Sequence, residues 1–398
     1  SVHQMHGRFM ISVWPKFYTN TDHYKELKAA GYAYTHSEDT SLVDWLGHEQ
    51  SFYDAYAEGG RKMFWRQMDE TLYSRYGKKI DAWWMDSTEP DVINAVTKES
   101  SEYELKKMDD NYLGTFARYL NTYSLLMVGN VYDHWRAEQP ERRAYILTRS
   151  TFAGQQRYAA TTWSGDIGAS WDVFRKQITA GISHCMSGLP YWTFDIGAFV
   201  LSSYDGVFCN SVRDPAYQEL YTRMFQFGAF CPIFRSHGSE VPREIWEFGE
   251  FSPTLIKFDN LRYRLLPYIV EQSARCCHNG MPMLRALLLH HPDDRQAWHI
   301  DDEYYFGDEF LVCPVMSDDG KRDLYLPEGR WVDFFTGDRY EGGRWYYDVE
   351  TPLDLMPVFV REGARIPLYP DDVDSTDDMD LSKATILEIT PDFQGYKF

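Results

Sequence analysis

Cysteine is scarce in this chain of 398 residues, and none of its six cysteines forms a C-x-x-C pair. The adjacent Cys276 and Cys277 are poorly spaced to act as zinc ligands. The sequence also lacks the H-E-x-x-H, EF-hand, P-loop and dinucleotide-binding signatures. We therefore expect mainly buried free thiols, no metal site and no cofactor.

Basic residues are fewer than acidic residues, 40 against 60. The formal net charge is −20 at pH 7, which argues against nucleic acids and anionic membrane surfaces as partners. No stretch of the sequence is long and apolar enough to span a bilayer. The sequence does not determine the compartment (periplasm, cell surface or cytoplasm) or whether the chain forms a homo-oligomer.

Aromatic residues, in contrast, are abundant. They make up 17% of the chain, beside 44% hydrophobic and 25% charged residues overall. That balance is typical of a globular protein with a large core, and most of the rings belong in such a core. Ligand pockets also have aromatic walls, and flat rings suit the apolar faces of a sugar.

Short apolar runs alternate with helical patterns over residues 1–300. This alternation predicts an α/β fold with a parallel sheet. A (β/α)8 barrel needs eight strands, and the sequence offers about six, so we expect a partial barrel. The expected strands are residues 9–14, 80–85, 144–148, 189–194, 230–234 and 283–289, and the expected helices are residues 23–30, 61–76, 115–138, 171–187, 215–227 and 259–277.

The pattern changes after Asp301. Short strand candidates such as residues 310–314 and 330–335 alternate with glycine-rich turns, and prolines interrupt the remainder. This pattern predicts an antiparallel β-sandwich. We therefore divide the chain into a barrel domain, residues 1–300, incomplete at its N-terminal side, and a C-terminal β-sandwich, residues 301–398.

The most informative stretch is residues 83–90, an aromatic run that stops on a carboxylate. Residues 79–85 are typical of a buried parallel strand, so Asp86 lies at its carboxyl end. In open α/β sheets and in barrels, that end of the strands carries the chemistry. Trp83 and Trp84 offer flat apolar faces beside it. The alternative is that Asp86 only caps the next helix.

A second aspartate, Asp166, lies in a loop between Gly165 and Gly168, close to Trp163. Two loop aspartates flanked by tryptophan are what glycoside hydrolysis needs: one carboxylate attacks the anomeric carbon and the other protonates the leaving oxygen. The sequence does not show that the two face each other. The alternative for Asp166 is an Asx turn within its loop.

Three further polar residues lie at predicted strand ends. The planar fork of Arg149 suits sugar hydroxyls, or it forms a salt bridge at the barrel rim. Asp195 is a carboxylate among aromatic residues, where a buried carboxylate usually binds something specific; the alternative is that it caps backbone amides. His237 follows Phe234 and Arg235, and a lone histidine is more often a structural residue than a site residue.

The chain resembles glycoside hydrolase family 31 over nearly its whole length. The nucleophile motif of that family, W-x-D-x-x-E, is matched by residues 84–89. The acid/base region of the family, R-S-T-F-A-G followed by W-x-G-D and W-D, is matched by residues 149–154, 163–166 and 171–172. The resemblance continues through the motifs at residues 191–197, 234–237 and 305–308.

This resemblance implies a retaining glycosidase with Asp86 as nucleophile and Asp166 as general acid/base. It also implies that His237 contacts the sugar in the glycone subsite, and that Trp84 and Trp163 line the same subsite. We expect Arg149 and Asp195 in that pocket too. A retaining mechanism requires the carboxyl groups of Asp86 and Asp166 to lie about 5–5.5 Å apart.

The motif details look most similar to the bacterial α-xylosidase branch of the family, N-terminally truncated. The resemblance implies that the early strands of the family's barrel are the ones missing from the partial barrel. Many α-glucosidases of the family have Met-Asn after the nucleophile, where this chain has Ser87 and Thr88, and residues 12–18 also suit the α-xylosidase branch. We therefore expect the release of terminal α-xylose from xyloglucan-type oligosaccharides. The alternatives are an α-glucosidase or transglycosylase of the same family, and an inactive carbohydrate-binding fragment.

Overall fold

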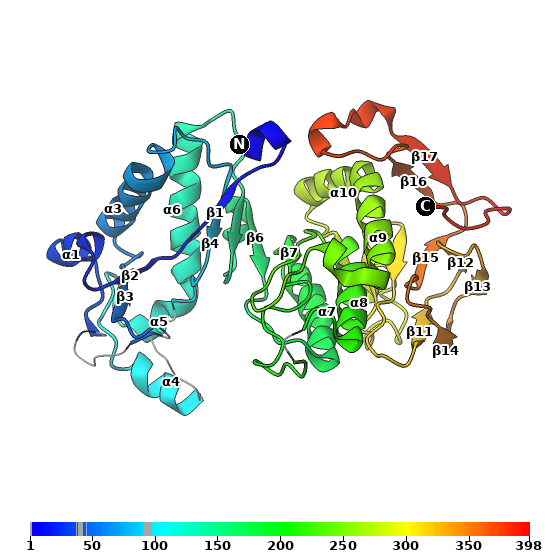
Figure 1. Ribbon diagram of the computed structural model, residues 1–398, viewed down its shortest axis with the longest axis horizontal. Coiled ribbons are helices and arrows are strands. Elements are labelled where there is room, and N and C mark those ends of the chain that lie inside the picture. The colour runs from blue at the N-terminus through cyan, green and yellow to red at the C-terminus, as the bar shows by residue number, and fades with distance from the viewer. Residues whose placement is uncertain (1, 37, 39–42, 45, 91–97, 210) are drawn as a thin grey trace. The chain divides into compact units, whose positions relative to one another are not determined.

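The computed structural model describes residues 2–36, 38, 43–44, 46–90, 98–209 and 211–398 of the chain (Figure 1). The chain folds into two compact units, Ser1–Trp163 and Ser164–Phe398. Across the described residues, no helix combines the length and apolar character needed to cross a membrane. Within the same residues, no group of three or more His, Cys, Asp or Glu side chains is placed to hold a metal ion.

The first unit is built on a parallel sheet in the order β1-β4-β5-β6. Its strands are β1 (Met10–Val13), β4 (Ala82–Met85), β5 (Ile146–Thr148) and β6 (Ala160–Trp163). Parallel registers such as Val13 with Met85, and Met85 with Thr148, align the carboxyl ends of neighbouring strands. The residues that follow these strands therefore emerge at one edge of the sheet.

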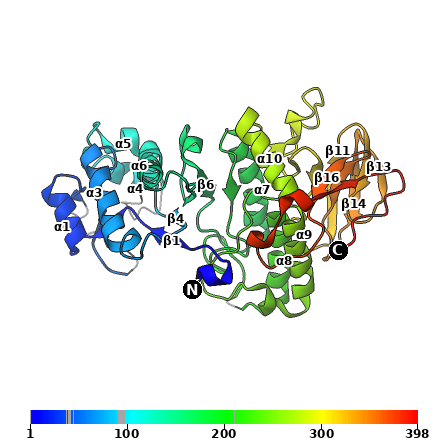
Figure 2. The ribbon, with the colours of Figure 1, turned by 90° about the horizontal axis from the view of Figure 1, so that it is seen from above.

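Helices cover this sheet and close its core. Helices α3 (Glu58–Met68) and α6 (Tyr123–Glu138) run side by side along it (Figures 1 and 2). Trp83 and Trp135 are almost fully buried in the cluster that joins them to the sheet. This unit also contains α1 (Asp22–Ala29), α4 (Lys98–Leu105), α5 (Phe116–Tyr119) and the antiparallel pair of β2 (Lys16–Tyr18) and β3 (Gln50–Phe52).

The second unit begins with helices around the short strand β7 (Trp192–Thr193). The ring of Trp192 lies so close to Gly181 that a Cβ there would meet it at 2.7 Å, so a glycine is needed for helix α7 to pack on this strand. The helices of this part are α7 (Trp171–Met186), α8 (Pro215–Ala229), α9 (Ser252–Arg264) and α10 (Leu266–Asn279).

The C-terminal part of this unit is antiparallel. Six strands form one sheet in the order β13-β12-β15-β10-β9-β8, and β11 and β14 pair separately, as do β16 and β17. Buried residues of both pairings, such as Leu324 of β11 and Phe359 of β15, share one apolar cluster. The strands are β8 (Leu284–Ala286), β9 (Tyr304–Phe306), β10 (Phe310–Val312), β11 (Lys321–Leu326), β12 (Arg330–Asp333), β13 (Arg339–Glu341), β14 (Arg344–Glu350), β15 (Val358–Arg361), β16 (Arg365–Leu368) and β17 (Thr385–Glu388).

Two of the predicted strands differ in the structure. Residues 230–234 form turns and bends, although they are an apolar run, because the segment is buried without pairing to a strand. Residues 283–289 contain β8, but β8 pairs antiparallel with β9 and belongs to the C-terminal sheet. The domain boundary at residue 300 stays a prediction.

Other elements follow the sequence more closely. Three predicted helices are confirmed within two residues, in α1, α7 and α8. The helix predicted over residues 61–76 is α3 continued by a π-helical turn, Asp69–Tyr73, and the helix predicted over residues 115–138 is divided into α5, a 3-10 turn and α6. The helix predicted over residues 259–277 is instead two helices, because Pro267 cannot continue α9 and starts α10 in its first turn. The six cysteines are free, and Cys185, Cys231, Cys276 and Cys313 are buried as expected.

Candidate active site

Asp86 directly follows β4, at the carboxyl edge of the parallel sheet. Its backbone N–H donates to the carbonyl of Val13 at 3.1 Å, which continues the pairing with β1 by one residue. Its carboxylate accepts the N–H of Ser87 at 2.7 Å, and the side chain is 14% exposed. Residues 87–90, which directly follow Asp86, are not helical, so Asp86 is not the N-cap of a helix.

Arg149 emerges from the neighbouring strand β5 and pairs with two carboxylates. One guanidinium nitrogen lies 3.3 Å from Asp86 Oδ1, and the other contacts Glu89. Arg149 therefore does form salt bridges, which was the alternative expected for this residue. Charge-assisted hydrogen bonds between a guanidinium and carboxylates are strong, so Arg149 ties the loop that follows β4 to the end of β5.

Thr88 joins the loops that carry Asp86 and Arg149. It is fully buried, and its hydroxyl lies 2.9 Å from the hydroxyl of Thr148. It also accepts the backbone N–H of Ser150 at 3.1 Å. These contacts fix the two loops relative to each other, which holds the carboxylate of Asp86 and the guanidinium of Arg149 in one arrangement.

Trp84 and Trp163 come together in the same unit, on strands β4 and β6. Their ring centroids are 5.6 Å apart, with the planes at 82°, an edge-to-face contact. Trp163 is buried and Trp84 is partly buried. The structure thus brings four of the predicted site residues, Asp86, Arg149, Trp84 and Trp163, to one end of one sheet.

Asp166 opens the second unit, exposed at the tip of a tightly built loop. Gly165 before it adopts a φ of 82°, in the left-handed region. A Cβ on Gly168 would lie 2.2 Å from the carbonyl oxygen of Ser203, so only glycine allows the two backbones to approach this closely. The loop is thereby held in place on both sides of Asp166.

Asp195 is fully buried and paired with Arg235. Its other carboxylate oxygen, Oδ2, has no hydrogen-bond partner among the described residues. Burial raises the pKa of Asp195 to about 7, and the charge of Asp166 adds to this, although Arg235 opposes it. Among the described residues, Asp195 therefore does not cap backbone amides: one oxygen of its buried carboxylate accepts from Arg235, and the other has no hydrogen-bond partner there.

His237 lies close to the same pair and is half-buried. Its ring stacks on Phe199, with centroids 5.5 Å apart and planes at 24°. Burial lowers the pKa of His237 to about 4, and the positive charges of Arg235 and Arg243 lower it further. The imidazole is therefore neutral near pH 7 and offers one donor and one acceptor nitrogen.

The predicted site residues thus form two sets, one in each unit. The first set is Asp86, Arg149, Trp84 and Trp163, and the second is Asp166, Asp195 and His237. That all seven line one pocket, and that the carboxyl groups of Asp86 and Asp166 are about 5–5.5 Å apart, stay predictions. Arg235 and Glu89 were missed as site residues, although both stand inside the motifs noted in the sequence.

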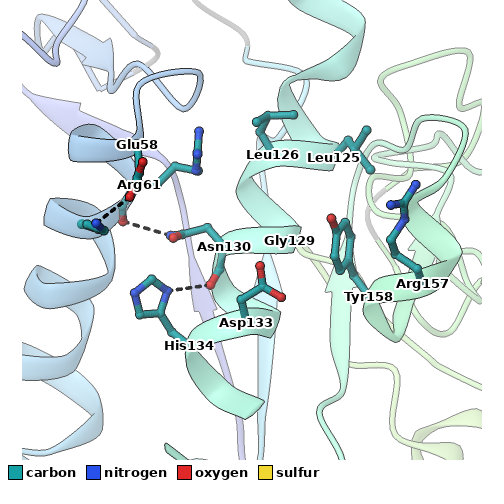
Figure 3. A pocket seen from close by; sticks show the side chains of 11 residues that line it. Glu58, Arg61, Leu125, Leu126, Gly129, Asn130, Asp133, His134, Arg157 and Tyr158 are labelled. Atoms are coloured by element: carbon teal, nitrogen blue, oxygen red, sulfur yellow. Dashed lines mark hydrogen bonds and ion pairs between the residues drawn. The ribbon is translucent and has the colours of Figure 1, made fainter. Parts of the chain in front are cut away.

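Two hollows of the first unit lie outside these sets. One, of about 390 Å³, lies between α3, α6 and the turn at Tyr158 (Figure 3). Its polar groups bind one another: Asn130 donates to the carbonyl of Arg61 at 3.0 Å, and the carbonyl of Asn130 lies 2.9 Å from His134 Nδ1. The other, of about 250 Å³, is lined by Trp14, Lys16, Phe17 and Tyr18, just after β1.

Comparison with known protein families shows which family this chain belongs to. Residues 1–272 match the glycosyl hydrolases family 31 TIM-barrel domain, and residues 280–366 match the glycosyl hydrolase family 31 C-terminal domain. The chain belongs to glycoside hydrolase family 31. The predicted fold class, a (β/α)8 barrel followed by an antiparallel C-terminal domain, is confirmed by this membership and by solved structures of the family.

Relatives within family 31 include several α-xylosidases. The α-xylosidase of Saccharolobus solfataricus is 34% identical over 380 residues, which are 95% of this chain and 48% of that protein. A crystal structure of the family 31 α-xylosidase of Xanthomonas citri is 40% identical with a TM-score of 0.88, and the match covers 97% of this chain and 42% of that one. The chain spans about half the length of the relatives that it matches.

Other family 31 relatives carry different names. A dextranase of Flavobacterium johnsoniae, solved as a mutant with isomaltotriose, is 28% identical with a TM-score of 0.82, covering 95% of this chain and 46% of that one. Alpha-glucosidase 2 of Bacillus thermoamyloliquefaciens is 32% identical over 295 residues, 73% of this chain and 35% of that protein. The family therefore includes enzymes named for different sugars at similar levels of identity.

The neutral state of His237 can be tested directly. Because its folded pKa is about 4, against an ordinary value of 6.5, the folded protein binds fewer protons than the unfolded chain between these values. The stability that His237 contributes is therefore present above pH 6.5 and is lost as the pH falls through about 4. We expect its NMR signal, assigned with His237→Gln, to stay unchanged from pH 8 to pH 5. A titration midpoint near 6.5 would contradict the burial described here.

The buried pair of Asp195 and Arg235 gives a second test. We expect Arg235→Met to destabilise the fold by about 3–5 kcal/mol at pH 9, because it leaves a buried charge without its partner. At pH 5.5 the loss is smaller, because Asp195, whose pKa is about 7, is already protonated in both proteins. Denaturant unfolding at the two pH values measures this difference. Arg365→Met, at the exposed pair with Glu388, is the matched control and shifts stability by at most about 1 kcal/mol. Equal losses at both pH values would rule out a buried ion pair.

Proposed function

We propose that the protein is a retaining α-glycosidase that releases terminal α-xylose from xyloglucan-type oligosaccharides. In the proposed reaction, Asp86 attacks the anomeric carbon while Asp166 protonates the leaving oxygen, and a covalent xylosyl-enzyme forms through an oxocarbenium-like transition state. Asp166, now a carboxylate, takes a proton from water, which attacks the anomeric carbon and releases xylose with its configuration retained.

The position of Asp86 carries this proposal. A carboxylate at the carboxyl end of a parallel barrel strand, partly exposed and 3.3 Å from an arginine, is placed where barrel enzymes carry their chemistry. Its motif, residues 84–89, fits the nucleophile motif of the family. In the proposed site, Arg149, Asp195 and His237 bind sugar hydroxyls, and Trp84 and Trp163 border the ring.

The preference for xylose rests on the relatives named above. Two α-xylosidases match 95% and 97% of the chain, at 34% and 40% identity. A second candidate, an α-glucosidase or transglycosylase, is supported by relatives with those activities in their names: the alpha-glucosidase 2 already described, and an isomaltosyltransferase of Sporosarcina globispora that is 32% identical over 220 residues. Xylose differs from glucose by one hydroxymethyl group, and a pocket discriminates such a group by about 1–3 kcal/mol.

Turnover of matched substrates tests the proposal. We expect the full-length protein to hydrolyse an aryl α-xyloside with a kcat/KM at least about tenfold above that for the same aryl α-glucoside. The first sugar seen by NMR is α-xylose, because a double displacement retains configuration. A preference for the glucoside would favour the second candidate. Binding of xylose without turnover of either substrate would instead indicate a carbohydrate-binding protein.

A further inference from the structure

Three loops of the second unit are joined through their backbones. We call residues 166–169 the acid loop, residues 195–201 the central loop and residues 235–241 the histidine loop. The carbonyl of Ile167 accepts the N–H groups of Phe199 at 2.9 Å and of Val200 at 3.2 Å, and Ala169 N–H donates to the carbonyl of Val200 at 3.0 Å. On the other side, Ser239 N–H donates to the carbonyl of Phe199 at 2.8 Å. The central loop therefore connects the other two.

The side chain of Arg243 bridges the central loop and the histidine loop. Its Nη1 donates to the carbonyls of Ser239 at 2.5 Å and Val241 at 2.7 Å. Its Nη2 donates to the carbonyls of Ala198 at 2.6 Å and Phe199 at 3.2 Å. One nitrogen thus serves each loop, which requires the planar fork of a guanidinium and two nitrogens at a fixed spacing.

Arg243 is built into this place. It is 8% exposed, and the hydroxyl of Tyr221 donates to its carbonyl at 2.8 Å. A Cβ on Gly238 would lie 2.1 Å from its guanidinium carbon, so the histidine loop passes it at the closest distance that a glycine permits. Among the described residues, no carboxylate lies within ion-pair distance of it. The hydrogen bonds from its two terminal nitrogens to carbonyl oxygens offset much of the desolvation penalty of its charge, whereas its Nε has no hydrogen-bond partner among the described residues.

The charge of Arg243 also reaches two predicted site residues. It opposes the rise in the pKa of Asp195 that burial causes. Burial is the largest cause of the lowered pKa of His237, and the positive charges of Arg235 and Arg243 lower it further. The side chain that joins the loops therefore also favours a charged Asp195 and a neutral His237.

We propose that Arg243 is a positioning residue of the reaction: it bridges the central and histidine loops and so fixes the backbone on which Asp166 and His237 are carried. This inference rests on the function proposed above, in which Asp166 is the acid/base. Without the bridge, the hydrogen bonds from Phe199 and Val200 to the acid loop lose their support. Proton transfer from Asp166 to the leaving oxygen requires hydrogen-bond reach, so displacement of the acid loop slows this step most.

Leaving-group dependence tests the proposal. We expect Arg243→Met in the full-length protein to lose about 10²-fold in kcat/KM on an α-xyloside with a poor, alkyl leaving group. On an aryl α-xyloside with an acidic phenol, which needs little protonation, the loss is less than about tenfold. Arg243→Lys keeps the charge but presents a single nitrogen, so its losses fall between those of the parent and of Arg243→Met.

Arg223→Met is the matched control. Arg223 is as deeply buried, and it donates to the carbonyls of Thr351 and Leu355 at 2.6 Å each, away from the three loops. We expect its loss to lower the melting temperature and to leave the ratio of kcat/KM on the two substrates unchanged. The same unchanged ratio in the Arg243 variants would overturn the proposal, because Arg243 would then act on stability alone.

A milder variant keeps the test valid if the Arg243 variants do not fold. Glu240 is exposed, and its carboxylate accepts Leu201 N–H at 2.8 Å, which joins the same two loops. Glu240→Ala, which removes the acceptor, is expected to change the ratio of kcat/KM on the two substrates in the same direction by a few-fold. Glu240→Gln, which keeps an acceptor, leaves that ratio unchanged.

Asp166→Ala is measured in parallel. If Asp166→Ala shows leaving-group dependence and the loop variants do not, this inference alone fails; if Asp166→Ala shows none, the proposed function fails with it.

Discussion

Asp86→Ala is expected to abolish turnover while the fold stays intact. The covalent step has no substitute nucleophile in the proposed mechanism, so kcat should fall by about 10⁴-fold or more. The side chain is small and partly exposed, so its removal opens no buried cavity. Steady-state kinetics on an aryl α-xyloside, beside a thermal unfolding curve, measure both effects.

Azide supplies the positive control for this variant. A small anion that enters the space left by the carboxylate attacks the anomeric carbon directly, and the product is a β-xylosyl azide. Asp22→Ala is the matched control, because Asp22 is a fully exposed carboxylate of the same unit, paired with Lys25, and its loss should leave kcat unchanged. Activity of Asp86→Ala within about tenfold of the parent would remove Asp86 from the nucleophile role, because a covalent route loses far more.

Asp166→Ala is expected to separate substrates by their leaving groups. An alkyl leaving group needs its proton in the transition state, so kcat/KM on a natural disaccharide should fall by about 10²–10⁴-fold. An acidic phenol leaves without help, so the same variant should keep most of its first step on an activated aryl xyloside. The second step, which needs Asp166 as base, becomes slow for both substrates.

A burst of phenol followed by slow turnover is therefore the expected time course for Asp166→Ala on the activated substrate. Rapid mixing with detection of the phenol resolves the burst, whose amplitude should approach one equivalent of enzyme. Equal losses on both substrates without a burst would assign Asp166 a structural role in its loop. Asp166 is exposed, so we expect its replacement to leave the fold intact, and a melting curve controls for this.

Local sequence patterns predicted those parts of the fold that are encoded locally. The run at residues 79–85 is apolar and ends on Asp86, and β4 and its carboxylate are found there. Helix α8 begins at Pro215 after Asp214, whose carboxylate accepts the N–H of Ala216, as a capping pattern predicts. Such signals need no knowledge of the distant chain.

Distant pairing decided the parts that the sequence could not predict. Strand β6 contains two threonines and follows a short turn, so its place in the sheet depends on pairing with β5. Residues 230–234 are as apolar as a strand but have no strand partner. Asp195 and Arg235 lie forty residues apart and meet because Ile196 and Ser236 form a parallel bridge. No single-sequence pattern encodes contacts of that kind.

Trapping of the covalent intermediate tests the central claim most directly. We propose to incubate the protein with a 5-fluoro-xylosyl fluoride, which forms the glycosyl-enzyme quickly and releases it slowly, and to map the labelled peptide by mass spectrometry. The account predicts one fluoroxylosyl group per protein, on the carboxylate of Asp86, and none in Asp86→Ala. A label on another carboxylate, such as Asp195, or turnover of xylosides with no label at all, would contradict it.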